Sequence, residues 1–175
     1  MKLLRRILNH FLHLLARSLP GSQTLRPLLH RLRGVKIYGS VFIGGDVYLE
    51  NEYPSCVEIH DGAAIGLRST IVAHTRGRGR VVIEKNAVAA AGCLIVCSSG
   101  KTLRIGEGSV VSAGSVVGND IPPRTLCAPP RIKAIAEVTV PFTLKTSYRD
   151  FIRGLRPMGK GAKQLHKKCG REEDR

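Results

Sequence analysis

The sequence predicts a parallel β-helix, because a six-residue repeat runs from Ile37 to Pro122. Twelve hexads can be read there; eleven begin with an aliphatic residue, and Ala89 is the exception. Neither the 3.6-residue period of a helix nor the alternation of an ordinary strand gives this pattern, whereas hexapeptide repeats are a signature of the parallel β-helix. The aliphatic first positions are Ile37, Ile43, Leu49, Ile59, Ile65, Ile71, Ile83, Ile95, Ile105, Val111 and Val117.

Extra residues interrupt the repeat in three places, each after a third hexad. The four resulting groups of hexads begin at Ile37, Ile59, Ile83 and Ile105. The insertions are Ser55–Glu58, Gly77–Val82 and Lys101–Arg104. Insertions in a repeat array map to loops on one face, often the binding face, so we expect a functional edge at this corner. The alternative is that one corner simply tolerates insertions best.

The net charge of +15 is concentrated at the two ends of the chain. Residues 1–36 hold eight Lys or Arg and no acid, residues 37–141 hold ten against nine acids, and residues 142–175 hold ten against four. This distribution favours a polyanionic partner at the ends, such as a membrane surface, a phosphorylated cofactor or nucleic acid. Five cysteines without a CxxC pair argue against a disulfide framework or a zinc site and favour a reducing cytosol.

The first 36 residues form a basic, helical segment. Apolar residues recur at three- and four-residue steps in 3–17, which predicts an amphipathic helix too short and too polar to span a bilayer. A second short helix is expected around 24–33. The first helix could lie on an anionic membrane through residues 1–17, or cap the open end of the coil, and the two roles are compatible.

The chain leaves the repeat after Pro122. We expect a β-helix domain over 37–122, a C-terminal extension over 123–157 with a short helix at 146–155, and a basic, disordered tail over 158–175.

Residues 37–133 resemble the hexapeptide-repeat acyltransferases of left-handed β-helix fold, in particular the sugar O-acetyltransferases of surface-polysaccharide pathways. The hexads, the run Ser69–His74 and the closing Ala128–Arg131 carry this resemblance. It implies an all-β, left-handed parallel β-helix of about four triangular coils with N-terminal helices and a short C-terminal extension. It also implies a homotrimer with active sites between subunits. From the cysteine usage and the basic first helix we expect the protein in the cytoplasm, at or near the inner face of the membrane.

The resemblance places the catalytic histidine at His74, beside the insertion corner. Transfer of an acyl group from a thioester to a hydroxyl needs a base, and imidazole titrates near neutral pH. The alternative is a lone solvated histidine. Glu52 occupies the same hexad position one coil earlier, so stacking at strand separation would let it accept a hydrogen bond from His74 and fix its tautomer; the alternative is an exposed acid.

The resemblance also assigns acetyl-CoA as co-substrate. It places the pantetheine arm along the backbone near Ala91 and Ala113, puts Asn119 near the cofactor, and brings Arg131 and Lys133 to the nucleotide phosphates. No metal site is predicted, because His60 is the only other histidine of the coil and a β-helix zinc site would need three.

Two functions follow from these observations. The first is acetyl transfer from acetyl-CoA to a hydroxyl of a sugar or surface-polysaccharide precursor at the cytoplasmic membrane face. The second is a non-catalytic β-helix scaffold whose basic ends bind membrane or nucleic acid. Nucleic acid is the weaker partner, because the basic ends carry few aromatic residues for base stacking.

Overall fold

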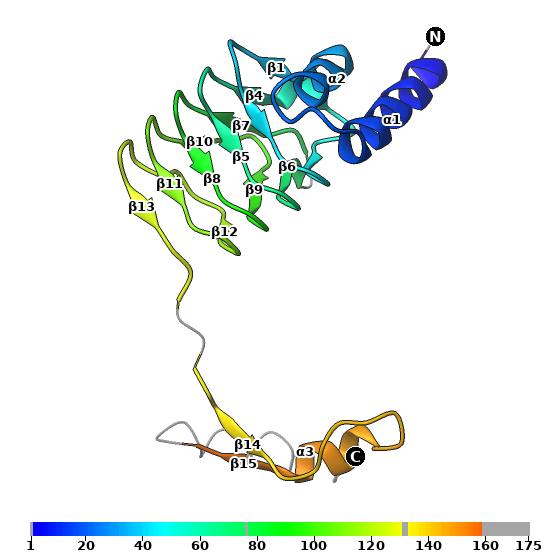
Figure 1. Cartoon of the computed structure of the whole chain (residues 1–175), viewed down its shortest axis with the longest axis vertical. Helices are drawn as coiled ribbons and strands as arrows, with labels where there is room; N and C mark the ends of the chain where they lie inside the picture. The colour runs from blue at the N-terminus through cyan, green and yellow to red at the C-terminus, as the bar shows by residue number, and fades with distance from the viewer. Residues whose placement is uncertain (1, 76, 131–132, 159–175) are drawn as a thin grey trace. The chain divides into compact units, whose positions relative to one another are not determined.

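A computed structural model describes residues 2–75, 77–130 and 133–158 and shows a parallel β-helix preceded by two helices (Figure 1). The helices are α1 (Lys2–Ser18) and α2 (Leu25–Arg33). The chain divides into two compact units, 1–129 and 130–175. The predicted basic tail falls on 159–175, outside the described residues.

Three parallel sheets form the sides of the coil. The first face has the order β1-β4-β7-β10, the second β13-β11-β8-β5-β2 and the third β12-β9-β6-β3. The first-face strands are β1 (Lys36–Ile37), β4 (Val57–Ile59), β7 (Arg80–Ile83) and β10 (Thr102–Ile105). The second face contains β2 (Phe42–Ile43), β5 (Ala64–Ile65), β8 (Val88–Ala89), β11 (Val110–Val111) and β13 (Leu126–Cys127). The third face contains β3 (Tyr48–Leu49), β6 (Thr70–Thr75), β9 (Leu94–Ser98) and β12 (Val116–Val117).

The strand register confirms the predicted coil starts. Ile37 pairs with Ile59, Ile59 with Ile83, and Ile83 with Ile105. Ala89, the exception in the repeat, takes its expected place between Ile65 and Val111 and is fully buried. The predicted left-handed parallel β-helix of about four coils is therefore the observed fold.

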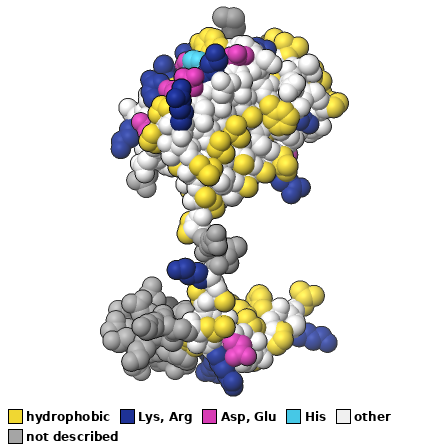
Figure 2. Space-filling model, turned by 60° about the vertical axis from the view of Figure 1, so that its left-hand side comes forward, with side chains coloured by type: hydrophobic (Ala, Val, Ile, Leu, Met, Phe, Trp, Pro, Cys, Tyr) yellow, Lys and Arg dark blue, Asp and Glu magenta, His cyan; other side chains and the backbone are white. Residues whose placement is uncertain are grey.

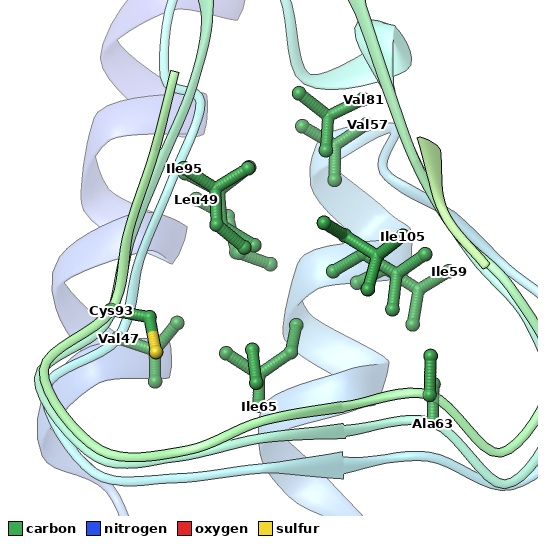
Figure 3. Packing of buried hydrophobic residues seen from close by; sticks show 14 of the residues in the cluster. Val47, Leu49, Val57, Ile59, Ala63, Ile65, Val81, Cys93, Ile95 and Ile105 are labelled. Carbon is green, nitrogen blue, oxygen red and sulfur yellow. The ribbon is translucent and has the colours of Figure 1, made fainter. Parts of the chain in front are cut away.

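The first residue of each hexad fills the interior of the coil. Figure 3 shows these side chains pointing inward in stacks, with Ile95 over Leu49 and Ile105 near Ile59. The core residues Ile43, Leu49, Ile59, Ile65, Ile71, Ile83, Ile95 and Ile105 have no exposed surface. Burying each such side chain stabilises the fold by roughly 1.5–3 kcal/mol, so the ladder is the main source of stability.

The insertions lengthen the strands of the first face. Val57, Val81 and Leu103 are inserted residues that pair in register across β4, β7 and β10, and all three are buried. A 3-10 turn, η1 (Pro54–Cys56), precedes β4. Part of each insertion therefore belongs to the first face of the coil, and only the other inserted residues form loops.

The coil also continues beyond Pro122. Leu126 and Cys127, at the start of the predicted C-terminal extension, pair in parallel with Val110 and Val111. The added strand satisfies the outer edge of β11, since Val110 and Ser112 donate backbone hydrogen bonds to the carbonyls of Thr125 and Cys127.

The N-terminal segment caps the open edge of the first coil. Ile43 donates its backbone hydrogen bond to the carbonyl of Ser22, and Asp46 donates to that of Arg17. Arginine side chains donate to edge carbonyls that lack a strand partner, Arg31 to Ile37 and Arg33 to Leu49. The capping role is therefore observed, and part of the N-terminal charge serves it.

The helix α1 packs against the rest of the unit through a mixed face that includes Asn9, Leu12 and Leu15, all half-buried. His13 and Ala16 are buried, and the His13 ring meets Tyr48 edge-on with centroids 4.9 Å apart. An apolar stripe is exposed, with exposed fractions of 73% for Leu4, 58% for Ile7 and 56% for Phe11. The amphipathic pattern thus predicts the helix correctly, but this apolar stripe is not part of the face that covers the coil.

The second unit contains β14 (Ala136–Val138), α3 (Tyr148–Arg153) and β15 (Leu155–Pro157). The strands β14 and β15 pair antiparallel, and the Phe142 and Phe151 rings lie 5.0 Å apart. Ser147 caps α3 by accepting a hydrogen bond from the backbone of Asp150, within the region predicted to be helical.

The two buried histidines of the cap predict acid sensitivity. Burial, with nearby Arg33 contributing, lowers the pKa of His13 and of His30 from 6.5 to about 3. The unfolded chain therefore binds more protons below pH 6.5, and stability should fall as pH drops from about 6.5 toward 3. We expect each group to contribute up to about 1.4 kcal/mol per pH unit in this window. Urea midpoints at pH 7.5 and 5.5 measure the loss.

The variant His13→Phe is the matched test, because phenylalanine keeps the ring contact with Tyr48 but cannot titrate. It should reduce the difference between the two urea midpoints. A wild-type midpoint that does not change over this pH range would contradict the prediction.

Candidate functional site

His74 lies at the insertion corner, at a bulge near the end of β6. Val72 pairs with Val96, whereas Thr75 pairs with Ser98, so β6 carries one residue more than β9 between these pairs. A bulge frees backbone groups from the ladder and redirects a side chain. The ring of His74 is 34% exposed, which leaves it accessible from solvent.

The hydrogen-bond partner of His74 is Glu50. Its carboxylate oxygen Oε2 lies 2.5 Å from Nδ1 of His74 and also accepts the backbone N–H of Ala73 at 2.9 Å. The other oxygen accepts the backbone N–H groups of Glu52 and Tyr53 at 2.9 and 3.3 Å. The Glu50 side chain has no exposed surface, so a fully buried carboxylate joins the first coil to the bulge of the second.

The predicted contact between Glu52 and His74 is replaced by this one. Two events shift the register on which that prediction depended: the bulge in β6, and the departure of the chain from the sheet after β3. Glu52 is exposed, and its backbone N–H donates to Glu50. Glu50 and Glu52 both belong to the hexad LENEYP. Alternation along a strand directs the two side chains to the same side, so the sequence does not show which of them meets His74.

Hydrogen bonds keep Glu50 ionised. Burial raises the pKa of its carboxyl, but the bonds from His74, Ala73 and Tyr53 together outweigh burial, and the pKa is lowered from 4.5. An ionised carboxylate can only accept, so Nδ1 of His74 must carry the proton of this bond. In the neutral ring this leaves the lone pair on Nε2, which has no protein partner among the described residues.

Gly79 closes the loop that follows His74. Its N–H donates to the carbonyl of Ala73 at 2.7 Å. A Cβ at this position would lie 2.6 Å from the carbonyl oxygen of Ser98 and 2.9 Å from the sulfur of Cys97, so only glycine fits. The sequence did not single out this residue, although glycine in an insertion is a signal of close backbone approach.

Aromatic and basic side chains border His74 on the side of the first coil. The Tyr53 ring meets the His74 ring edge-on with centroids 5.8 Å apart, and the Arg78 guanidinium lies 4.2 Å from the Tyr53 centroid. A cavity of about 690 Å³ opens here between α1, α2 and residues 51–55, and Tyr53 and Arg78 belong to its wall. Sequence reasoning missed this cavity, because it depends on how α1 sits against the first coil.

The predicted cofactor residues occupy separate positions. Ala91 and Ala113 stack at the turn that enters the third face, where Gly114 donates a backbone hydrogen bond to Ala91. Asn119 is exposed just beyond β12, at the same corner as His74 near the end of β6, and two strand spacings separate the two residues by about 10 Å along the coil. Arg131 lies outside the described residues, and Lys133 is exposed in the second unit.

The structure offers no metal centre within the described residues, where no group of three or more His, Cys, Asp or Glu side chains could hold an ion. His60 lies at another corner and pairs with Glu58 at 3.0 Å. The chemistry available at the insertion corner is therefore that of a partly exposed imidazole with a protonated Nδ1, held by a buried carboxylate.

Comparison with known proteins supports the fold. No family model matches the chain. The chain is 36% identical over 104 residues to the carboxysome assembly protein CcmN of Synechococcus elongatus. The matched region covers 52% of this chain and 63% of that protein. The match thus spans less than two thirds of the relative. Together with its hexads and parallel coils, it supports the description of this chain as a hexapeptide-repeat β-helix protein.

The central position of Glu50 leads to a stability prediction. We expect Glu50→Ala to lower the free energy of unfolding by about 3 kcal/mol, because four donors lose their buried acceptor. The exposed side chain of Glu52 makes Glu52→Ala the matched control, with a change within about 0.5 kcal/mol. Urea unfolding at pH 7.5 measures both.

A second measurement on the same variants tests the assigned tautomer. Nitrogen chemical shifts should show Nδ1 of His74 protonated in the wild type and a mixture of tautomers in Glu50→Ala. Equal destabilisation by the two variants, or a wild-type ring protonated on Nε2 alone, would contradict the role assigned to Glu50.

Proposed function

We propose that the protein is a CoA-dependent O-acetyltransferase in which His74 is the general base. The observation that carries the proposal is the bond between Nδ1 of His74 and the buried carboxylate of Glu50. A carboxylate held on one ring nitrogen fixes the tautomer and stabilises the imidazolium that forms when the other nitrogen takes up a proton. This combination is what proton abstraction from a hydroxyl needs near neutral pH.

The proposed reaction proceeds by direct attack. The acceptor hydroxyl gives its proton to Nε2 of His74 while its oxygen forms a bond to the carbonyl carbon of acetyl-CoA. A backbone N–H stabilises the resulting oxyanion. The bond from carbon to sulfur then breaks, and the imidazolium returns its proton to the CoA thiolate. The histidine ends in its starting state, and the acetyl group is on the acceptor oxygen.

The acceptor in this proposal is a hydroxyl of a sugar or surface-polysaccharide precursor. Donor contacts are proposed at Ala91, Ala113 and Asn119, with Arg131 and Lys133 at the nucleotide phosphates. Glu52 has no bond to His74, so a catalytic part for it stays a prediction that would depend on the acceptor.

A homotrimer with active sites between subunits is part of the same proposal. An apolar ladder on the outer surface of the second face supports self-association. It runs in register from β2 to β13, and Figure 2 shows a hydrophobic band on one face of the coil. The ladder consists of Phe42, Ala64, Val88, Val110 and Leu126, of which Leu126 is 72% exposed.

An assembly function is the second candidate. The relative named above is an assembly protein by name, and the apolar ladder would serve an assembly contact equally well. A scaffold of this kind needs no ordered His74–Glu50 pair. Activity therefore distinguishes the two candidates.

The test of the first candidate is release of CoA from acetyl-CoA with a panel of sugar, glycan and amino-acid acceptors. We expect acceptor-dependent release that His74→Ala reduces by about 100-fold or more, because general-base catalysis contributes 10²–10⁴-fold. His60→Ala is the matched control, since His60 also pairs with a glutamate but lies at another corner.

Each alternative result has a definite meaning. Equal release by the wild type and His74→Ala would remove His74 as the base. A wild-type protein that neither releases CoA with any acceptor nor binds acetyl-CoA would favour the assembly function.

We also propose that α1 holds the protein at an anionic membrane surface. No helix among the described residues is long and apolar enough to cross a bilayer. The exposed stripe of Leu4, Ile7, Phe11 and Leu14 has the spacing of one helix face, and the exposed Arg5 and Arg6 lie beside it. An apolar stripe flanked by arginines matches a helix lying in the interface of an anionic bilayer.

Vesicle binding tests this contact. The protein should sediment with phosphatidylglycerol-containing vesicles, less so at high salt, and only weakly with pure phosphatidylcholine. Ile7→Glu/Phe11→Glu should weaken binding by more than about tenfold, because it removes two large apolar side chains from the stripe that would be buried in the bilayer. Leu67→Glu, at an exposed leucine of the coil, is the control. Binding that the α1 variant leaves unchanged would contradict the proposal.

A further inference from the structure

The cavity beside His74 has an unbalanced positive charge. Arg5, Arg6, Arg33 and Arg78 contribute to its wall, and Glu52 is the one acid among the described residues that line it. None of these four arginines forms an ion pair with a carboxylate of the described residues. Clustered guanidinium groups without carboxylate partners repel one another, and a bound anion relieves that repulsion.

Arg33 contributes a positive charge to the cavity that persists at neutral pH. It is only 5% exposed, and its hydrogen bonds go to neutral groups, namely the side chains of Asn9, His30 and Asn51 and the carbonyls of Leu49 and Glu50. Burial lowers its pKa from 12.5 to about 10, so the group is still charged at neutral pH. The ionised carboxylate of Glu50 attracts Arg33 and offsets part of this charge, and the remainder adds positive potential to the floor of the cavity.

The cavity adjoins the candidate site through Tyr53, which lines the cavity and contacts His74. Tyr53 joins the two, because one ring edge meets His74 while the Arg78 guanidinium covers the ring. His74 itself does not line the cavity, so a molecule bound there would have to extend past the Tyr53 ring to reach the proposed base. Arginine forks suit phosphoryl oxygens, which they can contact in pairs.

We propose that this cavity binds a phosphoryl group carried by the acceptor, which makes the acceptor a sugar phosphate or sugar diphosphate. The inference rests on the proposed acetyl transfer and adds to it the chemical class of the acceptor. Its hydroxyl would reach His74 while its phosphoryl group lies between α1 and Arg78. The phosphoryl group can belong to a soluble nucleotide sugar or to a lipid-linked sugar, and the cavity would recognise the chemistry that both share.

Binding of inorganic pyrophosphate tests the site without reference to activity. Calorimetry should show that Arg5→Gln/Arg78→Gln weakens wild-type binding by about tenfold or more, because two charge-assisted contacts are lost. Arg33 is left in place, since it caps the coil. The charge-matched control is Lys85→Gln/Lys101→Gln, at exposed lysines outside the cavity, which should stay within about twofold of the wild type. Absence of wild-type binding, or equal weakening by both variants, would overturn the site.

Steady-state kinetics then assign the phosphoryl group to the acceptor. Arg78→Gln should raise KM for a UDP-sugar or a short-chain polyprenyl diphosphate sugar and leave KM for acetyl-CoA unchanged; turnover of either acceptor supports the proposal and identifies the source. If Arg78→Gln raises KM for acetyl-CoA instead, the cavity holds the donor phosphates and the assignment to the acceptor is wrong.

The inference and the proposed function fail in different ways. Acetylation of neutral sugars that depends on His74, combined with no pyrophosphate binding, would overturn the inference alone. Pyrophosphate binding that the arginine variant abolishes, without acetyl transfer to any acceptor, would support the anion site and overturn its link to acetyl transfer.

Discussion

The stacking of one aliphatic side chain per hexad is the constraint on which the structure depends. A parallel coil gains its core only if equivalent residues of successive turns lie above one another, and a shift of one residue would turn every inward side chain outward. Ile37, Ile59, Ile83 and Ile105 maintain that register through all three insertions. The insertions add inward residues of their own, such as Val81, which pairs in register with Val57 and Leu103 in a second buried column.

A coil built in this way has an open edge, and the basic N-terminal segment closes it. Arginine supplies several donors on one rigid group, so Arg31 and Arg33 can satisfy edge carbonyls that strands would otherwise pair. The same residues bring α1 and α2 against the first coil and so create the cavity beside Tyr53. Capping and the proposed anion site are therefore two consequences of the same basic segment, residues 1–36, which contains no acidic residue.

Glu50 connects this cap to the proposed chemistry. Its backbone carbonyl accepts from Arg33, and its side chain holds the bulge that carries His74. Burial of a carboxylate is costly unless hydrogen bonds compensate for it, and here four donors converge on two oxygens. The arrangement resists small displacements of the imidazole, because any movement of the ring would leave a buried charge with fewer partners.

The sequence by itself determined the coil, its starts and the position of His74 at the insertion corner. These depend on a six-residue period, and each hexad carries its own inward residue, so the register can be counted along the chain. Only the tertiary structure decided that Glu50 rather than Glu52 meets His74, and that the stripe of Leu4, Ile7 and Phe11 on α1 faces away from the coil. Both outcomes depend on contacts between distant segments: a bulge in β6 that offsets the count, and the contacts of Asn9 and His13 with the first coil, which orient α1. Periodicity describes one segment at a time and carries no information on such pairings.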